Sequence, residues 1–125
     1  MPAVDQGSSS RYKIVERLAE GGMAVVDRAL AVGPDGFQRE LGLKRIRPRF
    51  SRDERFARMF VDEARIVSQL FHPNIVQVHE FGKIDGDYFI AMEYVPGVDL
   101  SRLRRRLQED GEPFPLALAV FVILE

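Results

Sequence analysis

Two charged side chains stand where the sequence pattern otherwise predicts buried apolar residues, Lys44 in a strand-like segment and Glu63 in a helix-like one. Strand alternation places Lys44 on the same face as Gly42 and Ile46. Glu63 falls on an apolar stripe with the three-and-four spacing of a helix buried along one face. An unpaired buried charge is costly, so we expect the helix to pack on the strand with Lys44 and Glu63 as a partly buried ion pair. The purpose of such a pair would be to hold the lysine in one position. The alternative is that Lys44 extends into water and Glu63 only borders the stripe. The stripe consists of Phe56, Met59, Phe60, Ile66, Val67 and Leu70.

A glycine pair, Gly21 and Gly22, interrupts a β-prone stretch over residues 18–32. Glycine weakens a strand interior, so the pair marks a place where the backbone must bend or be approached closely. One interpretation is an ordinary hairpin, and the other is a loop whose backbone amides reach a phosphate group. The pair alone does not separate the two.

Composition predicts one globular domain. Of the 125 residues, 46% are hydrophobic and 30% are charged, and the formal net charge of -1 gives no bias toward nucleic acid or anionic membrane. The absence of cysteine excludes disulfides, and the two histidines form no cluster that would favour a metal site. The N-terminal residues lack the pattern of a secretory signal, and the longest apolar run, residues 116–124, is too short to span a bilayer as a helix. We therefore expect a cytoplasmic location with no membrane segment.

The elements that must position Lys44 and Glu63 follow from local pattern. Three β-prone runs predict an antiparallel meander, and a capping-box pattern with Ser51 as N-cap begins a long helix that ends near Phe71. Two further strands flank a turn at Asp85 and Gly86, and two helices complete the chain, the last apolar nearly all round. The expected strands are 12–18, 23–32, 40–47, 75–81 and 88–95, and the last helices cover 100–107 and begin near 115.

In chain order these features are a glycine hairpin, a strand lysine, a helix glutamate, HPNIV at 72–76 and MEYVPG at 92–97. This order resembles the N-terminal lobe of a bacterial member of the eukaryotic-type serine/threonine protein kinase family. The resemblance implies an α+β fold in which residues 11–95 form a five-stranded antiparallel sheet with one long packed helix. Residues 96–125 would form the hinge exit and the start of a truncated C-terminal lobe, and residues 1–10 a disordered lead-in.

The same resemblance implies a site for ATP. Lys44 would contact the α- and β-phosphates, with Glu63 holding it, while Met92 would be the gatekeeper and the backbone of Glu93 and Val95 would pair with the adenine edge. Gly42 stands where the family usually has alanine, which implies a roomier adenine pocket. The complete set of expected ATP-binding residues is Leu18, Ala19, Glu20, Gly21, Gly22, Met23, Ala24, Val25, Val26, Gly42, Lys44, Glu63, Met92, Glu93 and Val95.

The glycine loop departs from the family pattern G-x-G-x-x-G-x-V, which falls on Ala19, Gly21, Ala24 and Val26. If Ala19 or Ala24 needs positive φ, alanine there costs about 1 kcal/mol relative to glycine, and the loop is stiffer or higher over the phosphates than usual. Asp27 replaces an aromatic residue and has no functional explanation in the sequence. Arginines around the following loop are expected to form a solvated face or to contact an acidic partner. These are Arg45, Arg47, Arg49, Arg52, Arg55 and Arg58.

The catalytic and magnesium-binding motifs of the family, H-R-D-x-x-x-x-N and D-F-G, do not occur in the 125 residues. The resemblance implies that a full-length parent transfers phosphate from ATP to protein serine or threonine, with Mg²⁺, and that this chain is an inactive fragment of it. One alternative is a stand-alone, non-catalytic kinase lobe that regulates a partner. Another is an α+β domain that binds no nucleotide.

Overall fold

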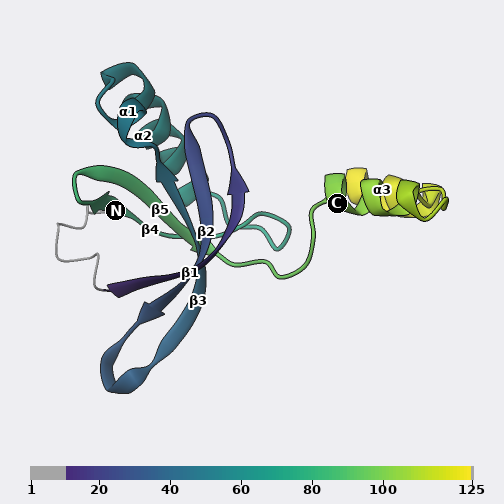
Figure 1. The fold of residues 1–125 in the computed structure, drawn as a ribbon, viewed down its shortest axis with the longest axis horizontal. Coiled ribbons are helices and arrows are strands. Elements are labelled where there is room, and N and C mark those ends of the chain that lie inside the picture. Colours follow the sequence, from purple (N-terminus) through teal and green to yellow (C-terminus); the bar gives the residue numbers. More distant parts are fainter. Residues whose placement is uncertain (1–10, 125) are drawn as a thin grey trace. The chain divides into compact units, whose positions relative to one another are not determined.

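The computed structural model describes residues 11–124, which divide into two compact units, one ending at Val95 and the other beginning at Pro96. The expected lead-in over residues 1–10 lies outside the described residues. The first unit is a five-stranded antiparallel sheet with one long helix, as the sequence predicts, and a short second helix that the sequence does not predict (Figure 1). The strands are β1 (Tyr12–Glu20), β2 (Ala24–Val32), β3 (Gln38–Ile46), β4 (Val78–Ile84) and β5 (Asp87–Glu93), in the sheet order β1-β2-β3-β5-β4.

The turns explain where the strands begin and end. A 3-10 turn, η2 (Pro34–Gly36), connects β2 to β3. Asp85 and Gly86, both at positive φ, form the two-residue turn expected between β4 and β5, a position that suits glycine. β4 begins three residues later than predicted, because Ile75 donates its N–H to the His72 carbonyl in a turn after α2.

Two helices follow β3, α1 (Pro48–Ser51) and α2 (Glu54–Ser68). The prediction of Ser51 as N-cap of the long helix is wrong. Pro48 begins a short helix of its own that includes Ser51, and the Asp53 carboxylate caps α2 by accepting from the Arg55 N–H at 2.9 Å.

One hydrophobic cluster lies between α2 and the sheet. Phe60 and Ala64 of α2 are buried against Ile46 and Ile90, with Val78 completing the cluster. The expectation that Met59, Ile66 and Leu70 belong to the buried stripe is wrong, since their exposed fractions are 55%, 62% and 42%. The centre of the buried face is therefore Phe60 and Ala64, and Glu63 lies at its border.

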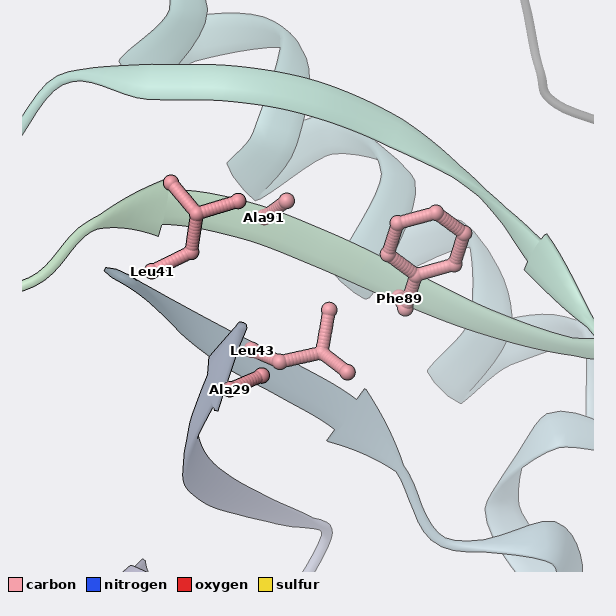
Figure 2. Packing of buried hydrophobic residues seen from close by; sticks show 5 residues of the cluster. All are labelled: Ala29, Leu41, Leu43, Phe89 and Ala91. Carbon is pink, nitrogen blue, oxygen red and sulfur yellow. The ribbon is translucent and has the colours of Figure 1, made fainter. Parts of the chain in front are cut away.

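A second cluster of buried residues contains no residue of α2. It comes from β2, β3 and β5 and consists of Ala29, Leu41, Leu43, Phe89 and Ala91 (Figure 2). The Tyr12 ring packs edge-on against the Phe89 ring, with centroids 5.5 Å apart.

The two edge strands of the sheet are joined by side chains. Tyr12, the first residue of β1, and the preceding Arg11 both donate hydrogen bonds to the Glu80 carboxylate of β4. Because β1 and β4 stand at opposite ends of the strand order, the sheet must curl to bring them together. Burial of the phenol, assisted by the hydrogen bond to Glu80, raises the pKa of Tyr12.

Charged residues on β2 join it to both neighbouring strands. Asp27 is almost fully buried, and its carboxylate accepts hydrogen bonds from Arg17 of β1 and from Arg45 of β3, the latter at 2.6 Å. The next residue, Arg28, pairs in the same way with Glu16 of β1 and Glu40 of β3. Asp27, which has no explanation from the sequence, thus holds three strands together on the face opposite α2.

The second unit contains α3 (Leu100–Glu109) and α4 (Leu116–Leu124). The Asp99 carboxylate caps α3 by accepting from the Arg102 N–H at 2.7 Å. Within residues 11–124, no helix combines the length and the apolar content needed to cross a bilayer.

We expect Asp27→Asn to lower the free energy of unfolding by about 3 kcal/mol, because the amide would present a donor to guanidinium groups that have only donors. Urea denaturation of the chain measures the change. The control is Glu16→Gln, which removes a partner from a more exposed ion pair and should cost under about 1 kcal/mol. Equal effects of the two substitutions would contradict the structural importance of Asp27.

Candidate nucleotide-binding site

The structure brings Lys44 and Glu63 together. Lys44 Nζ on β3 donates to Glu63 Oε1 on α2 at 2.7 Å, and the Phe60 ring centroid lies 5.9 Å from the same nitrogen. The side chains are 25% and 50% exposed, so the pair lies at the border of the core rather than inside it. The Lys44 ammonium group has three N–H donors, and the bond to Glu63 uses one of them, so the others can bind a second anion.

The pair lines an open cavity of about 960 Å³ between the glycine loop and α2. Of the expected site residues, Ala19, Glu20, Gly21, Gly22, Met23, Ala24, Val26, Lys44 and Glu63 line it. The remaining lining residues were not expected there; they are Met59, Phe60, Asp62, Ile66 and Val67, all from α2. The only feature of the sequence that could have predicted these residues in the cavity is their helical spacing relative to Glu63.

The glycine loop is a tight hairpin in which Gly21 N–H donates to the Ala24 carbonyl at 2.9 Å. Ala19 and Ala24 do not have positive φ, so the strain expected from alanine at these positions is absent. Gly21 and Gly22 do not have positive φ either. Their contribution is the missing side chain, since a Cβ on Gly22 would meet nothing within 4 Å and the backbone there is open to approach.

The other expected site residues do not line this cavity. They are Leu18, Val25, Gly42, Met92, Glu93 and Val95. Val25 is buried on the opposite face of the sheet, where it pairs with Arg45. Gly42 and Met92 are partners in the β3-β5 ladder, and Glu93 binds Gln77 through its backbone N–H, at 2.8 Å, and through its carboxylate.

Gly42 packs closely against Met92. A Cβ on Gly42 would lie 3.2 Å from Met92 Cγ, so alanine at this position would require the methionine to shift by a few tenths of an ångström. The two positions are therefore matched to each other, a small residue on β3 against a large one on β5.

The arrangement agrees with comparisons to known proteins. A sequence model of the protein tyrosine and serine/threonine kinase family matches residues 12–122, which include the lysine, the glutamate and the glycine loop. The chain belongs to this protein kinase family. The kinase-domain crystal structure of PknI from Mycobacterium tuberculosis superposes with a TM-score of 0.69 at 29% identity, over 97% of this chain and 47% of that one.

Curated bacterial kinases are also similar to this chain. Tyrosine-protein kinase MasK of Myxococcus xanthus is 41% identical over 91% of the chain, and serine/threonine-protein kinase PknI of M. tuberculosis is 34% identical over 90%. Serine/threonine-protein kinase PrkC of Bacillus subtilis is 41% identical over 74%. The chain spans only 18% of MasK, 18% of PknI and 14% of PrkC.

We expect the Lys44–Glu63 pair to contribute little to folding, because both side chains are partly in water. A double-mutant cycle with Lys44→Met and Glu63→Gln, measured by urea denaturation, should give a coupling free energy below about 1 kcal/mol. A coupling above about 3 kcal/mol would show that the pair is chiefly structural.

Proposed function

We propose that this chain is the ATP-binding part of a bacterial protein kinase that transfers the γ-phosphate of ATP to protein serine or threonine. The observation that carries the proposal is the Lys44–Glu63 pair at 2.7 Å on the wall of the cavity beneath the glycine loop. A lysine held by a carboxylate, with side-chain-free backbone opposite it, suits an anionic ligand with several oxygens.

Each residue of the site has a part in this proposal. Lys44 Nζ donates to oxygens of the α- and β-phosphates, and Glu63 fixes the ammonium by accepting one of its three hydrogens. Backbone amides of the glycine loop donate to the phosphates from above. Val26, which lines the cavity, covers the adenine together with Leu18, and the backbone of Glu93 and Val95, outside the cavity, binds the adenine edge.

Phosphoryl transfer needs groups that these residues do not supply. Mg²⁺ in this family is held by an aspartate and an asparagine from motifs that the 125 residues lack. Within residues 11–124, no three histidine, aspartate or glutamate side chains gather to hold a metal ion. The residues present therefore fit nucleotide binding and not the transfer step.

The acceptor hydroxyl has two candidates. PknI and PrkC are named serine/threonine kinases, which favours serine or threonine. MasK is named a tyrosine kinase and is 41% identical over 91% of the chain, so tyrosine is the second candidate. The remaining alternative is a non-catalytic lobe that regulates a partner. The comparisons with known proteins do not support this alternative better than the kinase proposal.

We expect ATP to raise the thermal unfolding midpoint of the chain, since a ligand that binds only the folded state stabilises it. Lys44→Met should weaken ATP binding by about 10-fold or more, the loss of a charge-assisted hydrogen bond to phosphate. The control is Lys13→Met, the same substitution at an exposed lysine of β1 that does not line the cavity. An unchanged midpoint with ATP, or equal effects of the two substitutions, would contradict the proposal.

Incubated with labelled ATP, the pure 125-residue chain should transfer no phosphate to serine, threonine or tyrosine peptides. The longest product of the encoding gene should label itself or a protein substrate, depending on Lys44, with phosphoserine or phosphothreonine found on acid hydrolysis. Phosphotyrosine alone would favour the second candidate. A reading frame that ends after Glu125 would favour the non-catalytic lobe.

A further inference from the structure

Arg47, which follows the last residue of β3, holds the backbone of the glycine loop at two points. Its guanidinium donates from Nε and from Nη2 to the Gly21 carbonyl, each at 3.1 Å. Its own backbone N–H donates to the Met23 carbonyl at 2.7 Å. One arginine therefore binds two of the three carbonyls between β1 and β2.

Arg47 lies on the face of the sheet opposite Lys44. The backbone at Arg47 is extended, so strand alternation continues from Arg45 to Arg47, while Lys44 belongs to the other face. Arg47 also lines, with Arg17 and Arg45, a separate cavity of about 270 Å³, and it does not line the larger cavity that contains Lys44. The Gly21 carbonyl is thus held toward the outer face.

The direction of this carbonyl fixes the direction of the next amide. A trans peptide is planar, so the Gly22 N–H points opposite to the Gly21 carbonyl. With the carbonyl on Arg47, the Gly22 N–H points away from the outer face, toward the side where Lys44 lies. Gly21 and Gly22 both line the larger cavity, so the peptide that joins them borders it.

The peptide between Gly21 and Gly22 needs such a restraint. Neither flanking residue has a Cβ, so rotation of this peptide meets less steric resistance than in any other part of the hairpin. A rotated peptide would direct a carbonyl oxygen, and not a donor, at a bound phosphate. If only part of the population has the donor orientation, the apparent affinity falls by that fraction.

We propose that Arg47 is a positioning residue of the phosphate site, which acts from the far side of the sheet by selecting the Gly21–Gly22 peptide orientation that offers the Gly22 N–H to phosphate. The inference rests on the proposed nucleotide binding and adds a residue that touches no part of the nucleotide. Arg17 and Arg45, the two other arginines that line the smaller cavity, both pair with Asp27.

The test uses the ¹⁵N-labelled 125-residue chain titrated with ATP, with inorganic tripolyphosphate and with adenosine. In the wild type, both phosphate compounds should shift the Gly22 amide proton signal. Arg47→Ala should weaken binding of ATP and tripolyphosphate about 5- to 10-fold, equivalent to one hydrogen bond, and leave adenosine binding unchanged. Arg47→Lys, with a single charged donor group in place of the two-pronged guanidinium, should restore part of the loss.

Arg52→Ala is the matched control, because it removes the same charge from an exposed residue nearby that does not line either cavity. It should bind all three compounds as the wild type does. If the wild type binds ATP and Arg47→Ala binds it equally well, the inference about Arg47 is overturned and the proposed function stands. An equal loss of adenosine and tripolyphosphate binding would show a general structural role and would overturn it too. A wild-type chain that binds neither phosphate compound would overturn the proposed function together with it.

Discussion

The alternation of side chains along β3 is the constraint on which the rest of this lobe depends. β3 lies inside the sheet, between β2 and β5, so both of its edges are paired, and each of its faces packs into one of the two hydrophobic clusters. Lys44 and Ile46 face α2, where one binds Glu63 and the other packs against Phe60. Leu43 and Arg45 face the other way, into the second hydrophobic cluster and onto Asp27. A register slip of one residue would exchange all four environments at once.

This constraint explains what the sequence could predict. Period-two alternation and helical spacing are local properties, so Lys44, Glu63 and the five strands could all be predicted from the residues. The turn at Asp85 and Gly86 was predictable for the same reason, because its dipeptide has a known backbone geometry. The partly buried ion pair that the sequence predicts is present, but Glu63 lies at the border of the buried face of α2, which is centred on Phe60 and Ala64.

The features that the sequence could not predict depend on side chains brought together by strand pairing or on backbone groups. Asp27 is explained only when β1 and β3 supply Arg17 and Arg45 on either side of it. The partner of Arg47 is a carbonyl oxygen, which leaves no signature in a sequence, so Arg47 was grouped with a run of surface arginines. Ser51 does not cap α2 because it belongs to the short helix that Pro48 begins. A capping-box pattern considers only the helix that follows it, so it could not predict this earlier helix.

The central claim is that β3 directs Lys44 toward the phosphates of a nucleotide and Arg47 away from them. A crystal structure of the chain with a non-hydrolysable ATP analogue tests it most directly. The account predicts phosphate oxygens within about 3 Å of Lys44 Nζ and of the Gly22 nitrogen, with the Gly21 carbonyl still bound to Arg47. Phosphates bound instead by Arg17, Arg45 and Arg47 on the outer face of the sheet would contradict it.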